Sequence, residues 1–189
     1  RNRVVWFAGE EQKQNTDLTT PSDFLSLSCQ QCERPACIRA CPVNPKAISK
    51  DPNTGIVRVN EDTCVGCGEC VTACPYGAMG YDSEGHHAVK CDLCFEHREE
   101  GATTTACASV CPTNAITFGN RDELQLKAKY MGRKQIDNDP FLLGPATIYL
   151  DREQNRNDPF DAQKRTIPSV LDTGYKIPSN KADFPYGFP

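Results

Sequence analysis

Twelve cysteines, all between residues 29 and 111, carry the clearest chemistry in this 189-residue sequence. They form three groups of four: Cys29-x2-Cys32-x4-Cys37-x3-Cys41-Pro42, Cys64-x2-Cys67-x2-Cys70-x3-Cys74-Pro75 and Cys91-x2-Cys94-x12-Cys107-x3-Cys111-Pro112. The middle group has the spacing with which bacterial ferredoxins bind [4Fe–4S] clusters, including the proline after the fourth cysteine. The outer groups keep the opening C-x2-C and the closing C-x3-C-P. This repeated pattern predicts iron–sulfur clusters.

Two other roles for the cysteines fit the spacing less well. Structural zinc sites also use C-x2-C pairs, but they combine two such pairs and do not require further cysteines followed by proline. Disulfide frameworks are typical of shorter secreted chains, and they give no reason for a repeated C-x2-C-x2-C-x3-C-P pattern. A [4Fe–4S] cluster needs four thiolates, one for each iron, which agrees with groups of four cysteines.

The composition limits the fold and the function. Hydrophobic residues make up only 38% of the sequence and the mean hydropathy is −0.56, so we expect metal clusters to stabilise a small core. Acidic and basic residues are mixed along the chain with a net charge of −4, which argues against nucleic-acid binding. Apolar runs such as residues 4–8 are far shorter than the roughly 20 residues that span a bilayer. We find no Ser-His-Asp arrangement, phosphate loop or dinucleotide motif that would indicate catalysis.

The elements that would position the cysteines repeat along the chain. Each group is expected to form a loop and a short helix, then Cys-Pro and a short strand. The three strands would contain residues 47–48, 78–79 and 115–116. A turn and a return strand in residues 51–59 would complete the first hairpin, and residues 81–89 would complete the second. The predicted fold class is α+β, in which ferredoxin-like modules of short β-hairpins and short helices surround the clusters.

Four regions follow from this pattern. They are an N-terminal strand and loop segment (1–28), a two-cluster ferredoxin-like module (29–89), the third cysteine group with the following helix (90–132), and an extended C-terminal arm (133–189). The arm is rich in proline and has too few apolar residues to build a core of its own. Its aromatic residues would serve as anchors, so we expect it to bind along a partner.

Smaller elements can be predicted around the cysteine groups. Residues 4–8 and 24–28 have the pattern of short strands. The insert 95–106 in the third group is charged and rich in threonine, which favours a solvated or partner-facing loop. Asn120, with Glu123 three residues later, has the pattern of a helix N-terminus. The apolar stripe of that helix would consist of Leu124, Ala128 and Met131.

The sequence resembles the iron–sulfur electron-transfer subunits of complex molybdoenzymes of the dimethyl-sulfoxide-reductase and formate-dehydrogenase type. The residues that carry the resemblance are SCQQCERPAC (28–37), CVGCGEC (64–70), ACPYG (73–77), KCDLC (90–94), CPTNAITFG (111–119) and GPATIY (144–149). It covers about residues 24 to 150.

The resemblance implies a ligand set for each cluster, crossed between groups as in two-cluster ferredoxins. Cluster A would be held by Cys29, Cys32, Cys37 and Cys74, cluster B by Cys41, Cys64, Cys67 and Cys70, and cluster C by Cys91, Cys94, Cys107 and Cys111. Family members usually carry a further cysteine group near the N-terminus, and we expect that group to be missing here. With that segment present in the protein, the resemblance implies that it supplies the fourth ligand of cluster C and that Cys111 serves a fourth cluster. Without it, Cys111 closes cluster C. At least three [4Fe–4S] clusters are expected.

The resemblance also implies a function without catalytic residues. The protein would relay electrons between a molybdenum- or tungsten-pterin catalytic subunit and a membrane quinone-reactive subunit or a soluble carrier. It would lie at the periphery of a bacterial or archaeal cytoplasmic membrane, attached through its partner subunits. The alternative is a free-standing polyferredoxin, which would tolerate deletion of residues 133–189.

Overall fold

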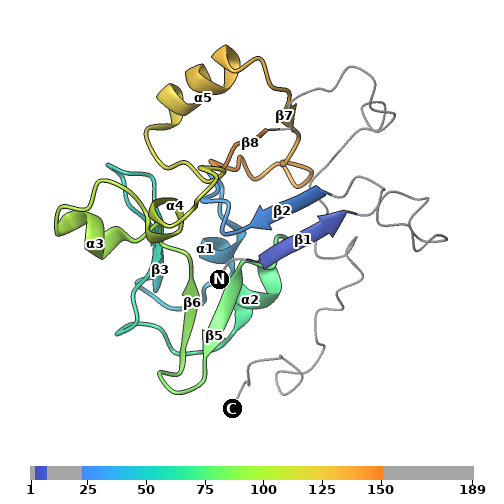
Figure 1. Ribbon diagram of the computed structural model, residues 1–189. Helices are drawn as coiled ribbons and strands as arrows, with labels where there is room; N and C mark the ends of the chain where they lie inside the picture. The colour runs from blue at the N-terminus through green and yellow to red at the C-terminus, as the bar shows by residue number, and fades with distance from the viewer. Residues whose placement is uncertain (1–2, 8–22, 151–189) are drawn as a thin grey trace.

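The computed structural model describes residues 3–7 and 23–150, which form short antiparallel strand pairs and short helices (Figure 1). The strands are β1 (Arg3–Phe7), β2 (Asp23–Leu27), β3 (Ile48–Lys50), β4 (Val57–Val59), β5 (Met79–Asp82), β6 (His87–Lys90), β7 (Gln135–Ile136) and β8 (Tyr149–Leu150). The helices are α1 (Ala36–Ala40), α2 (Glu69–Ala73), α3 (Phe95–Glu99), α4 (Ala106–Ser109) and α5 (Arg121–Tyr130). Each strand pairs with its neighbour in sequence, so this arrangement confirms the predicted α+β class.

The two predicted hairpins are present and follow the first two cysteine groups. β3 pairs with β4, and β5 pairs with β6, both antiparallel. In the first hairpin the Asp51 carboxylate accepts hydrogen bonds from the backbone N–H groups of Asn53 (3.0 Å) and Thr54 (2.6 Å). This side chain closes the turn by bonding to the backbone N–H groups that follow it, as aspartate often does in turns. The predicted strands near the N-terminus also form, and β1 pairs with β2.

The hydrophobic core lies between the two hairpins and the helices α1 and α2. Its buried members are Ala47, Ile48, Val57, Val71, Met79, Tyr81 and Ala88, together with Cys41 and Cys70. Cys37, Cys64 and Cys74 pack against this core from its edge. Five of the candidate metal ligands are therefore part of this core or of its boundary.

The third cysteine group differs from the first two. No strand forms at residues 115–116, so the prediction of a third strand is wrong. In the first two units a return strand follows and pairs, whereas here the polypeptide continues from this segment into α5. Ala115 is exposed, so it gains no burial that would favour a strand.

The insert of the third group is not wholly a solvated loop. It begins with α3, whose first residue, Phe95, is only 7% exposed. The Arg58 guanidinium lies over the Phe95 ring, 3.8 Å from its centroid. A cation on an aromatic face is an attractive contact, and it fixes the start of the insert to β4.

Helix α5 begins where the sequence predicts it. The Asn120 side chain accepts hydrogen bonds from the N–H groups of Asp122 (2.9 Å) and Glu123 (3.4 Å), as an N-cap does. The predicted apolar stripe is correct at Ala128, which is buried, but Met131 is 49% exposed. The helix therefore contacts the body over a narrower strip than predicted.

Residues 133–150 pack against the body of the same polypeptide. Tyr149 of β8 is buried with Leu27 and with Ile136 of β7. The Phe141 ring meets the Tyr76 ring edge-on, with centroids 5.5 Å apart. Tyr149 and Phe141 belong to the predicted partner-binding arm, yet here they contact their own protein. The rest of that arm, residues 151–189, and residues 8–22 of the predicted N-terminal strand and loop segment lie outside the described residues.

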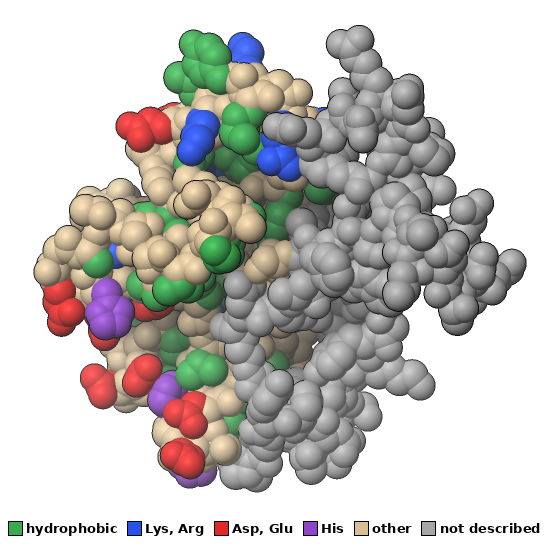
Figure 2. All heavy atoms as spheres, viewed as in Figure 1, with side chains coloured by type: hydrophobic (Ala, Val, Ile, Leu, Met, Phe, Trp, Pro, Cys, Tyr) green, Lys and Arg blue, Asp and Glu red, His purple; other side chains and the backbone are tan. Residues whose placement is uncertain are grey.

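The surface carries charges of both signs. On the face shown in Figure 2, acidic and histidine side chains gather over the β5–β6 hairpin and α3, and lysine and arginine side chains gather over α5. Among the helices in residues 23–150, none has both the length and the apolar character needed to cross a bilayer.

Candidate metal centres

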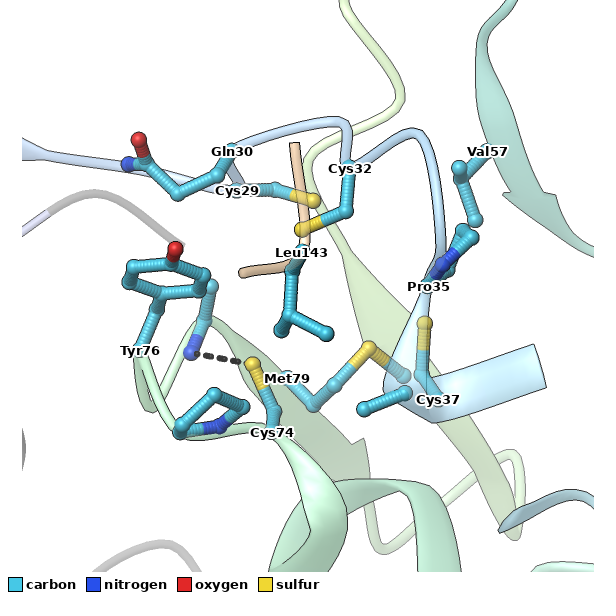
Figure 3. A pocket seen from close by; sticks show the side chains of 13 residues that line it. Cys29, Gln30, Cys32, Pro35, Cys37, Val57, Cys74, Tyr76, Met79 and Leu143 are labelled. Atoms are coloured by element: carbon cyan, nitrogen blue, oxygen red, sulfur yellow. Dashed lines mark hydrogen bonds between the residues drawn. The ribbon is translucent and has the colours of Figure 1, made fainter. Parts of the chain in front are cut away.

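Four cysteines from distant parts of the sequence line one cavity. Cys29 and Cys32 lie in the loop after β2, Cys37 lies in α1, and Cys74 follows α2. Figure 3 shows their sulfur-bearing side chains facing a common space. The remaining lining is mainly apolar and includes Pro35, Ala36, Val57, Pro75, Ala78, Met79 and Leu143. The structure thus brings together the four cysteines predicted for cluster A.

The electrostatics of these thiols reflect their burial and their closeness to one another. Burial raises the pKa of Cys32 to about 12, and the neighbouring Cys29, Cys74 and Cys37 act in the same direction. Burial likewise raises the pKa of Cys37 to about 11, with Cys29 and Cys74 adding to the effect and Lys90 opposing it. Four thiolates would repel one another here unless positive charge compensated them, and the irons of a cluster supply such charge.

The chemistry of this cavity fits a [4Fe–4S] cluster. Thiolates are the ligands that such clusters use, and the backbone N–H of Ala78 donates to the Cys74 sulfur at 3.4 Å. Within the described residues, no group of three or more cysteine, histidine or acidic side chains is arranged to hold a single metal ion. A cubane accommodates more widely separated sulfurs, because each thiolate binds a different iron.

The second candidate site lies against the first. Burial raises the pKa of Cys70 to about 12, and Cys37, Cys64 and Cys67 act in the same direction. Cys37 and Cys74 of the first cavity pack against the same core that contains Cys70 and that Cys64 also contacts, so the two cysteine sets adjoin. The backbone N–H of Ala88 donates to the Cys64 sulfur at 3.4 Å.

Cys41, the fourth cysteine predicted for cluster B, lies buried in the same core as Cys70. Burial acts to raise the pKa of Cys41, but hydrogen bonds from the N–H groups of Val43, Ala47 and Ile48 outweigh it and lower the pKa. These donors would stabilise the Cys41 sulfur as a thiolate. The turn after Cys41 therefore prepares this residue for metal binding.

The third cysteine group is more exposed to solvent than the first two groups, since it contains the exposed Cys107. Burial raises the pKa of Cys91, whereas Cys107 is exposed and its sulfur lies 3.3 Å from the Thr105 hydroxyl. The N–H of Ala106 donates to the Cys94 sulfur at 3.5 Å.

Hydrogen bonds lower the pKa of Cys111, as they do for Cys41. A hydrogen bond from the Thr113 side chain and further bonds from the backbone of Ile116 and Ala115 lower the pKa of Cys111 to about 7. Its sulfur lies 3.6 Å from the Thr113 hydroxyl oxygen. The lowered pKa favours the thiolate form that binds iron, and the role of Cys111 in cluster C or in a fourth cluster stays a prediction.

Two glutamines between Cys29 and Cys32 form buried contacts that the sequence analysis did not predict. Gln30 is 2% exposed, and its amide donates to Ser28 O (2.9 Å) and to the Tyr149 hydroxyl (3.0 Å) while its carbonyl accepts from Asn138 (3.2 Å). The sequence does contain one hint, because a solvated loop has no need of two adjacent glutamines between Cys29 and Cys32. Gln30 ties this loop to residues 138–149.

Gln31 makes the matching connection in the other direction. Its carbonyl accepts the N–H of Val57 at 2.8 Å, and its amide donates to Cys91 O at 2.8 Å. One side chain thus joins the first cysteine loop to β4 and to the start of the third cysteine group.

Replacing Gln30 with methionine should lower the free energy of unfolding by about 1–3 kcal/mol. The side-chain volume is nearly kept, but the Asn138 amide and the Tyr149 hydroxyl would lose a buried partner. Urea denaturation of the cluster-loaded protein measures the change. Gln125→Met on the exposed side of α5 is the matched control and should leave the unfolding midpoint unchanged. Equal midpoints for the two variants would contradict the role given to Gln30.

A family model described as a 4Fe-4S dicluster domain matches residues 20–121. The thiosulfate reductase electron transfer subunit PhsB of Salmonella typhi is 36% identical over 124 residues, which are 66% of this sequence and 62% of that protein. The B subunit of the anaerobic dimethyl sulfoxide reductase of Escherichia coli is 38% identical over 128 residues, 66% of this sequence and 60% of that protein. The B subunit of the polysulfide reductase of Wolinella succinogenes is 38% identical over 123 residues, 65% and 62% respectively. The sequence thus spans about 60% of the length of these relatives.

Proposed function

This protein belongs to the 4Fe-4S dicluster domain family, and from that premise we propose that it is an electron-transfer subunit of an oxidoreductase complex. The observation that carries the proposal is the convergence of four cysteines on one mainly apolar cavity that adjoins a second cysteine set. Adjoining sites of this kind suit the passage of electrons from one to the next. The names of the relatives, which include an electron transfer subunit and the B subunits of two reductases, support the same role.

The proposed ligand sets are those that the resemblance implies. Cluster A is assigned to Cys29, Cys32, Cys37 and Cys74, cluster B to Cys41, Cys64, Cys67 and Cys70, and cluster C to Cys91, Cys94 and Cys107, with Cys111 as its fourth ligand or as a ligand of a further cluster. The support for the first set is the shared cavity, and the support for the second is the influence of Cys64 and Cys67 on the pKa of Cys70.

The residues around the sites would hold the clusters and shield them from water, and none is assigned a catalytic step. A bound [4Fe–4S] cluster supplies the ability to take up and release one electron at a time. The apolar lining of the first cavity limits the access of water, and the N–H groups of Ala78 and Ala88 direct partial positive charge at ligand sulfurs. Hydrogen bonds to sulfur, local charge and burial are the means by which a protein sets a cluster potential.

The proposed partners are a molybdenum- or tungsten-pterin catalytic subunit and a membrane subunit that reacts with quinone. The protein would then lie at the periphery of the cytoplasmic membrane of a bacterium or archaeon, attached through those subunits. The basis is the family resemblance together with the reductase names of the relatives.

Anaerobic purification of the tagged protein from its native host tests this function. We expect about twelve irons and twelve acid-labile sulfides per molecule if three cubanes are bound. We also expect molybdenum or tungsten to co-purify in a fixed ratio to this protein. A Cys67→Ser variant should keep the catalytic activity of the complex with an artificial dye while electron transfer from quinol stops.

Two results would contradict the proposal. One is a protein loaded with iron and sulfide that purifies alone, without molybdenum or tungsten, and exchanges electrons only with soluble carriers, which would favour the polyferredoxin alternative. The other is full quinol-linked activity in Cys67→Ser, because this relay requires cluster B.

A further inference from the structure

Leu143 lies within the first cysteine cavity, although it follows the last cysteine by more than thirty residues. It is 6% exposed and packs with Tyr76 and Ala78, against which Cys29, Cys32 and Cys74 also pack. Figure 3 shows its side chain among the four cysteine side chains. An apolar side chain from a distant segment thus completes the wall of the cavity.

The backbone on either side of Leu143 is fixed by hydrogen bonds. The Asp139 carboxylate accepts the N–H of Leu143 (2.6 Å) and the N–H of Gly144 (3.1 Å). The carbonyl oxygens of the same two residues accept the N–H groups of Arg34 (3.0 Å) and Glu33 (2.7 Å). Because both residues are bonded through N–H and carbonyl alike, Leu143 is held over the loop that contains Cys32.

The segment 137–146, called the strap from here on, is also tied to the opposite side of the cavity. The Tyr76 hydroxyl donates to Asn138 O at 3.0 Å, and the Asn138 amide donates to the Gln30 carbonyl at 3.2 Å. Phe141 packs edge-on against Tyr76. The strap therefore contacts the residue that follows Cys29 and the residue two positions after Cys74.

We propose that Leu143 is a potential-setting residue for cluster A, and that the strap holds its side chain as a seal between the cluster and water. This inference rests on the proposed function, since it assigns cluster A to this cavity. One-electron reduction adds negative charge to a site that four thiolates already make negative. Water would stabilise the added charge, and its exclusion disfavours the reduced form. Leu143 thus lowers the reduction potential of cluster A and slows the loss of its iron.

Leu143→Ala is the direct test, with Leu142→Ala as its matched control. The first change shortens the seal and keeps every backbone hydrogen bond of the strap. The second makes the same chemical change at a side chain that is 73% exposed. Redox titration of the full-length, cluster-loaded protein, followed by electron paramagnetic resonance, measures each cluster potential. Release of iron to a ferrous chelator under anaerobic conditions measures access to the site.

In Leu143→Ala we expect one cluster to titrate at a higher potential and to lose its iron roughly tenfold faster, because the site opens to water. The remaining clusters and the Leu142→Ala control should behave as in the unchanged protein. An unchanged potential together with unchanged iron release in Leu143→Ala would overturn the proposal. A shift of all cluster potentials by the same amount would also overturn it, because the effect of Leu143 would then not be specific to cluster A.

A second pair of variants tests the position of the strap without changing the cavity lining. Gly144 and Gly132 both have a φ of +63°, so alanine strains the backbone at both. A Cβ on Gly144 would lie 2.8 Å from the Cβ of Glu33, whereas a Cβ on Gly132 would meet nothing within 4 Å. Gly144→Ala should displace the strap and raise the potential of the same cluster that Leu143→Ala affects. Gly132→Ala should leave that potential unchanged. Equal shifts of the potential in the two variants would contradict the role of the strap.

These measurements separate the inference from the proposed function. Protein that contains no iron and no sulfide would contradict the cluster assignment itself. Fully loaded protein whose cluster potentials do not respond to Leu143→Ala or Gly144→Ala would contradict only the role of Leu143. Neither readout requires a catalytic partner.

Discussion

Replacing Cys74 with alanine should remove the same cluster as replacing Cys29, even though 45 positions separate the two residues. Both cysteines line one cavity, whereas Cys74 is close in sequence to Cys64, Cys67 and Cys70 of the second set. We expect each single variant to lower the iron content by about four irons per molecule, since one cubane is lost. Electron transfer through the protein should stop in both.

The double variants decide between the crossed arrangement and one in which each sequence group holds its own cluster. Cys29→Ala combined with Cys74→Ala should lose no more iron than either single change, because the two residues act on one site. Cys29→Ala combined with Cys67→Ala should lose two clusters, which is a loss of about eight irons per molecule. If Cys74→Ala and Cys67→Ala instead proved to act on one cluster, the crossed assignment would be wrong. Iron analysis and electron paramagnetic resonance of anaerobically prepared protein provide the measurement.

Loading of clusters into the metal-free protein should depend steeply on pH. A cysteine binds iron as the thiolate, so each protonated thiol must lose a proton, and loading should weaken by roughly tenfold per thiol for each pH unit below the thiol pKa. The pKa values of Cys32 and Cys70 are raised to about 12 and that of Cys37 to about 11, so these thiols stay protonated through neutral pH. Loading should therefore be favoured as pH rises from about 7 to about 9.

The same shifts give the sign of the effect on the metal-free fold. A thiol whose pKa is higher in the folded protein than its ordinary value of 9.0 stabilises the fold below that pH, and this contribution is lost as pH rises towards 12.

Cys111, whose pKa is lowered to about 7, should contribute little proton release above neutral pH. Proton release during anaerobic reconstitution, measured in a pH-stat against a protein-free sulfide control, tests the prediction. If the unchanged protein and Cys32→Ser released the same number of protons, the prediction that Cys32 loses a proton on cluster loading would be contradicted.

Local sequence signals account for the elements that were predicted correctly. The first hairpin follows from a turn in which the Asp51 side chain bonds to the N–H groups of Asn53 and Thr54. The start of α5 follows from Asn120, which caps the helix with its own side chain. In both cases the residues that decide the structure lie within three positions of one another, so a short pattern contains the information.

Contacts between distant residues explain what sequence patterns missed. The bond between Gln30 and Tyr149 joins residues 119 positions apart, and that between Gln30 and Asn138 spans 108. Neither residue type predicts such a partner by itself, so a local pattern does not reveal that residues 133–150 contact the cysteine loop. The cysteine spacing predicted the kind of site, but the place of Leu143 in its wall depends on how the strap folds back.

The position of the strap in the sequence has a consequence for biosynthesis. All cysteines that line the first cavity have been translated once Cys74 leaves the ribosome, whereas Leu143 follows 69 residues later. At about 5–20 residues per second, the interval is roughly 3 to 14 seconds. During that time the nascent polypeptide offers the complete set of four thiols without the side chain that covers them. The order of synthesis thus leaves a period in which the cellular assembly machinery can deliver a cluster before the site closes.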